Sequence, residues 1–369
     1  MNIQLRGEQD SRVVSPESLI AWEQGHARPA MADLEALAAV YDCPVGYFFL
    51  EEPPVESTPI SFRGLDRSKV SDLSADSLIS IERFRFLSRW FANAIAELGM
   101  SWTVSIGSAE LGESPAEVGR RERNRLGFFP MIRTDWRTPS EAFAWWRRAV
   151  EGLGVFVFEL KLNPREVRGA SLWIGGRYPF ILVNRQDDEY AAGRLLSLLH
   201  EYAHLITAQD GSVCDLRGMG GGAETFANEV AAKILIQDDE FDQVLATEIK
   251  PAQGQEWSDA RIDRLRSSLR VSRDVVAILL ERRRLAPSGF YRQRRSRWSA
   301  RSINRGGRSA NPLTRTRRVL RDLGTSGAMV ISSERAESLS PLDLGAVAGV
   351  KVDHLDQVLR ELRGSVLRR

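Results

Sequence analysis

Apolar residues recur at helical spacing over much of this 369-residue chain, and three short runs have the apolar character of strands. Helices are expected at 74–98, 115–125, 139–152, 189–207 and 223–236. Strands are expected at 155–158, 170–174 and 179–184. Gly175-Gly176 between the last two strands indicates a hairpin. The pattern predicts an α+β fold with a small antiparallel sheet.

Short helices are expected on both sides of this region. Ser15-Pro16-Glu17 is typical of a helix start, and Gly25 ends that helix. A second helix follows Pro29, and the acidic, proline-containing run at 51–56 reads as a linker. From about residue 240 the chain is expected to be mostly helical, with small helix-turn-helix units at 265–285 and 339–362.

The composition is that of a globular protein, since 43% of the residues are hydrophobic and the length allows two or three domains. No stretch approaches 18 uninterrupted apolar residues, and the first ten residues lack an apolar signal core, so a cytoplasmic location is expected. Cys43 and Cys214 are the only cysteines and lie far apart. They indicate neither a disulfide framework nor a cysteine zinc site.

The run His200-Glu201-Tyr202-Ala203-His204 has the spacing of a metal-binding helix. Side chains at i and i+4 share one face of a helix, so His200 and His204 can hold the same ion. Glu201 lies beside that face, where its carboxylate can act as a general base instead of a ligand. This is the division of labour in H-E-x-x-H metalloproteases.

A catalytic zinc ion takes three protein ligands and keeps one position open, so a third ligand is needed. Glu224, in the helix expected at 223–236, is the candidate. Asn228 lies one turn further on, where its amide can hold the second ring nitrogen of His200 or His204 and fix its tautomer. The alternative is an ordinary solvated helix face without metal.

A strongly basic stretch lies in the C-terminal third, although the formal net charge of the whole chain is only +2. Fourteen arginines and no Asp or Glu lie from Arg282 to Arg321. Aromatic residues are interleaved with the arginines: Phe290, Tyr291 and Trp298. Such a mixture suits phosphate contact and base stacking. The candidate nucleic-acid contacts are Arg294, Arg295, Arg297 and, in the first N-terminal helix, Ser18. A solvated loop is the alternative, which the Ser, Gly and Asn residues at 302–311 favour.

From about Gly154 to Gln237 the chain resembles the ImmA/IrrE family of metallo-endopeptidases, in particular its long members with an N-terminal Xre-type helix-turn-helix. The motifs are Ser-Leu-Trp-Ile, Tyr-Pro-Phe-Ile-Leu-Val-Asn, Leu-Leu-His-Glu-Tyr-Ala-His-Leu-Ile and Glu-x-x-Ala-Asn-x-x-Ala-Ala. The resemblance implies a zincin-like fold, Zn²⁺ held by His200, His204 and Glu224, and Glu201 as the catalytic residue. It also implies that the substrate is a repressor of a mobile element or of a stress response.

The N-terminal part of the resemblance is incomplete. Residues 15–29 resemble the recognition helix and following turn of an Xre domain, but only fourteen residues precede them, and a full domain needs two more helices there. We therefore expect a truncated helix-turn-helix remnant at 1–52, a linker at 53–73, a metallopeptidase domain at 74–240 and a mostly helical region at 241–369. A helical subdomain used for packing or dimerisation is the alternative for residues 1–52.

These observations predict a cytoplasmic zinc endopeptidase that cleaves a regulatory protein, bound as an extra strand along a sheet edge near the metal. One alternative is a DNA- or partner-binding transcriptional regulator with an idle or structural metal site. Glu201 argues against it, because a structural zinc site uses four protein ligands and no base. Another alternative is a hydrolase of non-peptide substrates.

Overall fold

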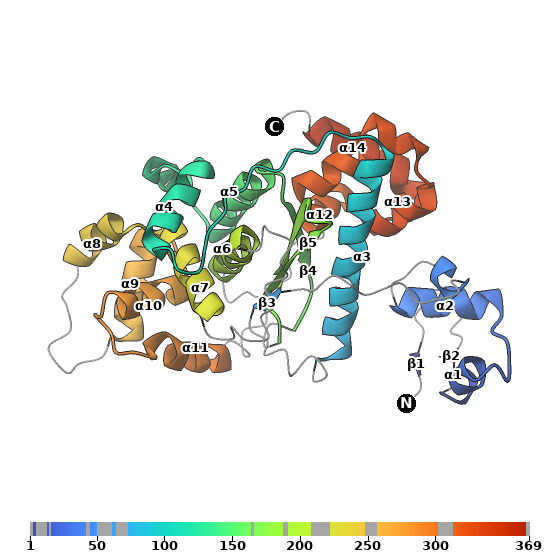
Figure 1. Cartoon of the computed structure of the whole chain (residues 1–369), viewed down its shortest axis with the longest axis horizontal. Coiled ribbons are helices and arrows are strands. Elements are labelled where there is room, and N and C mark those ends of the chain that lie inside the picture. The colour runs from blue at the N-terminus through green and yellow to red at the C-terminus, as the bar shows by residue number, and fades with distance from the viewer. Residues whose placement is uncertain are drawn as a thin grey trace.

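A sheet between two groups of helices forms the centre of the protein (Figure 1). The computed structural model describes residues 3–4, 13–14, 16–41, 45–49, 61–63, 73–163, 166–186, 191–207, 222–247, 257–301 and 313–366. The sheet has four strands in the order β3-β5-β6-β4. They are β3 Ser61–Arg63, β4 Phe156–Leu160, β5 Gly169–Ile174 and β6 Tyr178–Asn184. The predicted α+β fold, a sheet flanked by helices, is confirmed.

The predicted hairpin joins β5 to β6, which pair antiparallel from Ile174↔Tyr178 to Gly169↔Val183. Gly175 and Gly176 have φ values of 60° and 62°, left-handed values that glycine adopts without strain, and together with Arg177 they form the three-residue turn between the paired residues Ile174 and Tyr178. The tight turn sets the register of the two strands, and with it which side chains of β5 point to which face of the sheet.

The sheet is mixed, so the prediction of an antiparallel sheet is wrong in this respect. β4 runs parallel to β6, with Phe156 opposite Phe180 and Leu160 opposite Asn184. The reason is the strand order. The β5–β6 hairpin folds back so that β6 lies between β5 and β4, and a strand that follows two reversals runs in the original direction. Local periodicity carries no information on this order.

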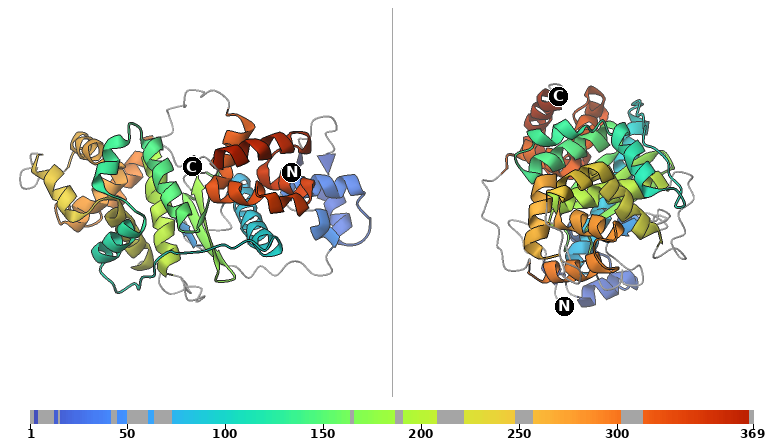
Figure 2. Two further views of the ribbon diagram at one scale, coloured as in Figure 1. Left: turned by 90° about the horizontal axis from the view of Figure 1, so that it is seen from above. Right: turned by 90° about the vertical axis from the view of Figure 1, so that its left-hand side faces the viewer.

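Successive residues of each strand supply two separate cores, because side chains alternate between the faces of a sheet. Val157, Ile181 and Val183 belong to one core, whereas Phe156 and Phe180 belong to the other. A sheet buried on both faces needs a helical layer on each side. The view from above shows these two layers (Figure 2).

The first layer carries the predicted metal residues. Its helices are α4 Pro115–Arg125, α5 Pro139–Gly152, α6 Ala191–Thr207, α7 Gly222–Leu235 and α8 Asp238–Ala246. α5 starts where the sequence signals a start: Thr138 and Glu141 form a capping box, and Pro139 occupies the first turn. α6 packs against β5, β6, α5 and α7, so it lies at the centre of this layer.

The second layer covers the opposite face of the sheet. It consists of α3 Ala75–Glu97, α12 Arg315–Ile331, α13 Pro341–Ala348 and α14 Leu355–Val366. Ser74 caps α3 by accepting a hydrogen bond from the backbone N–H of Ser77. Phe91 of α3 packs on Phe156 and Phe158 of β4, with ring centroids 5.3 and 5.5 Å apart. Helices that are far apart in the chain, α3 and α12 to α14, thus share one core.

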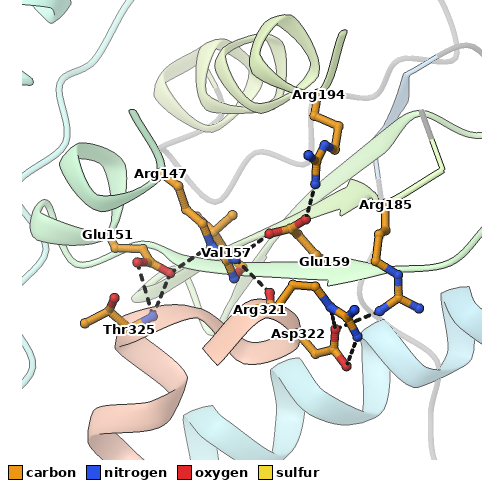
Figure 3. Close-up of polar contacts among 9 residues, drawn as sticks. All are labelled: Arg147, Glu151, Val157, Glu159, Arg185, Arg194, Arg321, Asp322 and Thr325. Atoms are coloured by element: carbon orange, nitrogen blue, oxygen red, sulfur yellow. Dashed lines mark hydrogen bonds and ion pairs between the residues drawn. The ribbon is translucent and has the colours of Figure 1, made fainter. Parts of the chain in front are cut away.

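A buried ion network connects β4 to helices on both sides (Figure 3). The guanidinium of Arg147 on α5 donates to Glu159 of β4 at 2.6 Å and lies 3.3 Å from Glu151. Arg194 of α6 donates to the other carboxylate oxygen of Glu159 at 2.7 Å. Each carboxylate therefore faces a guanidinium, which offsets part of the desolvation of these charges.

The same network fixes a break in α12. Gly324 has φ 71° and ψ −176°, which interrupts the helix and leaves the backbone N–H of Thr325 without a helical partner. Glu151 accepts this N–H at 3.1 and 3.2 Å (Figure 3). A Cβ on Gly324 would lie 2.8 Å from Arg147 and 2.9 Å from the carbonyl oxygen of Val157. The close packing of α12 against α5 and β4 at this position therefore requires glycine.

The remaining α-helices and the two short strands lie at the two ends of the view in Figure 1. Next to α7 and α8 are α9 Asp259–Leu269, α10 Arg273–Arg282 and α11 Phe290–Arg301. At the N-terminal end are β1 Ile3–Gln4, β2 Val13–Val14, α1 Pro16–Glu23 and α2 Met31–Tyr41. Short 3₁₀ helices cover Val45–Phe49, Pro130–Asp135, Glu334–Ser338 and Val352–His354. The two short strands pair with each other.

Candidate metal centre

α6 and α7 bring His200, His204 and Glu224 together. One ligand atom from each residue lies within 4.8 Å of the other two. The two histidines are buried, whereas 40% of the Glu224 side chain is exposed, so the group is accessible from the Glu224 side. The i, i+4 spacing on α6 and the packing of α7 against α6 together produce this convergence.

The distances fit a tetrahedral metal ion. The two Nε2 atoms of the histidines lie 3.0 Å apart. Oxygens of Glu224 lie 3.3 Å from Nε2 of His200 and 3.2 Å from Nε2 of His204. Tetrahedral ligands about 2.1 Å from zinc are roughly 3.4 Å from one another, close to these spacings. The donor set of two imidazoles and one carboxylate is also one that zinc accepts in catalytic sites.

Asn228 fixes the orientation of one ligand. Its Oδ1 lies 3.1 Å from Nδ1 of His200, while its Nδ2 donates to the backbone carbonyl of Glu224 at 2.8 Å. With the amide oriented in this way, Nδ1 of His200 must carry the proton and donate to Asn228. Nε2 is then the nitrogen of His200 that is left to bind a metal ion, and it faces the other two candidate ligands.

Glu224 is ionised at neutral pH. Burial raises the pKa of its carboxyl group, but the hydrogen bonds and charge of His200 and His204 outweigh burial and hold this pKa well below its usual range. Metal ligation requires the carboxylate form, so the group is in the correct state to bind a cation.

Glu201 lies on the same helix but outside the three-ligand group. Its side chain is fully buried, and its Oε2 accepts a hydrogen bond from Oγ of Ser171 on β5 at 2.8 Å. Gly169 lies two residues before Ser171 on the same face of β5. A Cβ at Gly169 would be 2.9 Å from Oε1 of Glu201. The carboxylate is thus enclosed between α6 and β5.

Tyr202 anchors α6 to α4. Its hydroxyl donates to Oε2 of Glu122 at 2.7 Å, and both side chains are buried. Burial, together with the carboxylate of Glu122, raises the pKa of Tyr202 well above its usual value, so the phenol stays neutral and remains a donor. Arg125 lies 3.1 Å from the same carboxylate oxygen. The tyrosine in the middle of the motif therefore has a structural partner.

Sequence reasoning did not identify Ser171 or Glu122 as partners of the motif. Both lie far from it along the chain, 30 and 80 residues before their partners. One signal was available for Ser171. Gly169, Ser171 and Trp173 alternate with Ala170, Leu172 and Ile174, so one face of the strand is less apolar than the other.

Several arginines of the arginine-rich stretch are paired with acidic residues elsewhere in the chain. Arg294, a predicted nucleic-acid contact, is 7% exposed, donates to the carbonyl of Trp257 at 2.7 Å and pairs with Asp259. The prediction is wrong for Arg294, because a buried and paired guanidinium cannot reach a phosphate. Arg282 and Arg283 likewise pair with Glu229 and with Asp238.

Nucleic-acid contact by the other candidates stays a prediction. Arg297 is exposed on α11, while Arg295 is half-buried and donates to the hydroxyl of Tyr291 at 3.0 Å. Ser18 is half-buried on α1.

Cys43 and Cys214 lie outside the described residues. No helix in the described ranges has the length and apolar character required to cross a membrane.

Comparison with known proteins agrees with this geometry. Residues 150–281 match a peptidase family model described as the IrrE N-terminal-like domain. The match runs from the end of α5 to α10 and includes the sheet strands β4 to β6 and both metal helices. No curated protein and no solved structure matches the chain. Residues 150–281 are therefore similar to the IrrE N-terminal-like domain of peptidases, which supports a metallopeptidase-type function.

Proposed function

We propose that this chain is a zinc-dependent endopeptidase that cleaves a transcriptional repressor of a mobile element or of a stress response. One observation carries the proposal: two histidines and a glutamate converge as candidate ligands, while a second glutamate, Glu201, directly follows His200 on α6 and is not part of the ligand set. The repressor as substrate rests on the family resemblance of the sequence.

Each residue of the site has a role in this reaction. His200, His204 and Glu224 would hold the ion, and Asn228 orients His200. A bound zinc ion supplies Lewis-acid chemistry, polarising the scissile carbonyl and making water a stronger acid. Glu201 takes the proton from the attacking water and returns it to the leaving amine. Its enclosure by β5 limits the orientations of its carboxylate.

The alternative of a regulator with a structural zinc ion has less support. Structural zinc sites use four protein ligands, and the described residues offer three in one group. A structural site also needs no neighbouring carboxylate outside the ligand set. Glu201 therefore favours the enzyme.

An extended substrate fits the sheet edge beside the metal helix, because strand addition satisfies the backbone groups of both chains. Within the described residues β5 is already paired with β3, from Ser61↔Ser171 to Arg63↔Gly169, and β3 also packs near α6. We therefore place the substrate strand along the outer edge of β3.

Glu201→Gln tests the proposal. The wild-type chain and this variant are each expressed in the same cells, and new protein N-termini are identified by mass spectrometry. We expect cleavage products that are specific to the wild type, with equal zinc content in the two purified proteins, because Glu201 is the base and not a ligand. Identical sets of N-termini for the two proteins would overturn the endopeptidase proposal.

A further inference from the structure

We propose that Ser171 is the positioning residue for the catalytic carboxylate of Glu201, and that Gly169 keeps the space this carboxylate occupies. The inference rests on the proposed peptidase function. It extends the site beyond α6 and α7, because β5 supplies the part of the active site that orients the base.

The first step of the argument is the face of the sheet on which Ser171 lies. Residues of the neighbouring strands that point toward α6, among them Val157, Ile181 and Val183, are fully buried and apolar. Ser171 places a hydroxyl on this same face and is only 3% exposed. A buried hydroxyl without a partner is costly, so its presence here requires an acceptor.

That acceptor is Glu201. Oγ of Ser171 lies 2.8 Å from Oε2, and an ionised carboxylate only accepts hydrogen bonds, so the serine is the donor. The bond fixes one oxygen of a side chain that has several rotatable bonds. A base held in one orientation needs no reorganisation before proton transfer, which is the physical advantage of this contact.

Gly169 limits the carboxylate from the same face. A Cβ there would lie 2.9 Å from Oε1 of Glu201, 3.0 Å from its Cγ and 3.2 Å from the carbonyl oxygen of Leu182. The backbone of β5 is held on both sides, by β6 and by β3, so it cannot easily move away. The carboxylate of Glu201 therefore occupies the space that a side chain at position 169 would fill.

A double-mutant cycle on the metal-free protein tests the contact independently of catalysis. The unfolding equilibria of the wild type, Ser171→Ala, Glu201→Ala and the double variant are measured by urea denaturation. We expect the effect of Ser171→Ala on the unfolding constant to be about tenfold smaller when Glu201 is already absent. Additive effects would overturn the contact, whether or not the protein is a peptidase.

The role of Ser171 in positioning the carboxylate is then tested by the rate of cleavage. The rate is measured for the product that the wild type forms and that Glu201→Gln does not form. Ser171→Ala is expected to lower the rate about tenfold or more while keeping zinc, and Ser171→Thr, which retains the hydroxyl, is expected to recover most of it. Gly169→Ala is expected to lower the rate by displacing the carboxylate.

Ser197→Ala is the matched control. Ser197 is also buried, but its hydroxyl donates to the carbonyl of Gly193 one turn earlier on α6. We expect this variant to keep the wild-type rate. Equal rates for Ser171→Ala and Ser197→Ala would overturn the proposal, and so would a failure of Ser171→Thr to recover activity while folding like the wild type. Absence of any wild-type cleavage would instead overturn the proposed function and leave the result of the double-mutant cycle valid.

Discussion

Single side chains next to the three candidate metal ligands are expected to determine how well these residues bind an ion. Asn228→Ala removes the acceptor 3.1 Å from Nδ1 of His200, so the imidazole loses its fixed tautomer and orientation. We expect zinc affinity to fall by about 10–100-fold. A competition titration with a coloured chelator measures this change. Asn124→Ala, an exposed position on α4, is the control, and equal affinities for the two variants would contradict the role of Asn228.

Tyr202 makes a second contact at the residue scale that is unrelated to metal binding. Tyr202→Phe leaves the buried carboxylate of Glu122 without its phenolic donor. The loss is expected to lower the free energy of unfolding by about 1–3 kcal/mol, because a hydrogen bond to a charged group is removed while Arg125 still faces the carboxylate. Chemical denaturation measures it. Tyr178→Phe, at a buried position on β6 whose hydroxyl has no hydrogen-bond partner among the described residues, should cost clearly less; a similar cost for both would contradict the account.

At the scale of elements, the close approach of α4 to α7 holds the helix that carries Glu224. Gly119 of α4 faces Lys233 of α7, and a Cβ there would collide with Cβ of Lys233 and lie 2.9 Å from its carbonyl carbon. Glycine to alanine normally stabilises a helix by up to about 1 kcal/mol. At Gly119 we expect the opposite sign. Gly152→Ala in α5, where a Cβ meets no atom within 4 Å, is the control. The midpoint of thermal unfolding is measured for both variants. A higher midpoint for Gly119→Ala than for the wild type would contradict this packing.

The burial of Glu151 beside the break in α12 predicts that the stability of the protein depends on pH. Burial raises the pKa of Glu151 above its ordinary value of 4.5, although Arg147 opposes the shift. The native state therefore keeps its proton when the unfolded chain has already lost it, and the stability that Glu151 contributes falls as the pH rises above 4.5. Glu151→Gln lacks this titration. In urea denaturation with a metal chelator present, we expect the variant to gain stability relative to the wild type as the pH rises through this window. A difference that stays constant with pH would contradict the assignment.

At the scale of the whole molecule, the matched family domain is only part of the folding unit. Residues 150–281 include the strands β4 to β6 but neither α3 nor α12. These two helices cover the face of the sheet that carries Phe156, Phe158 and Phe180. Burial of each such side chain contributes about 1.5–3 kcal/mol. We expect a fragment of residues 150–281 to lack cooperative thermal unfolding by circular dichroism, whereas residues 53–369 unfold cooperatively. A cooperative transition of the short fragment near the midpoint of the full chain would show that the outer helices are dispensable.

Much of the local structure was predictable because its causes lie within a few residues. Pro139 and the Thr138 capping group mark the start of α5, and two glycines mark the β5–β6 turn. The arginine-rich stretch shows where this reasoning ends. Arg294 has aromatic and basic neighbours in sequence, but its acidic partner Asp259 lies 35 residues earlier. A window of sequence shows the charge of a residue and not its partner.

The sequence by itself determined the helices α3 to α7, the strands β4 to β6 and the spacing of His200, Glu201 and His204, because capping, turn geometry and helical periodicity act over a few residues. It did not predict β3, which lies inside the segment expected to be a linker at 53–73. Only the tertiary structure decided the parallel pairing of β4 with β6, the pairing of Arg294, and the hydrogen bond from Ser171 to Glu201. The physical reason is that these interactions join residues distant in the chain. Their geometry depends on the order in which strands and helices pack, and periodicity within one element does not encode that order.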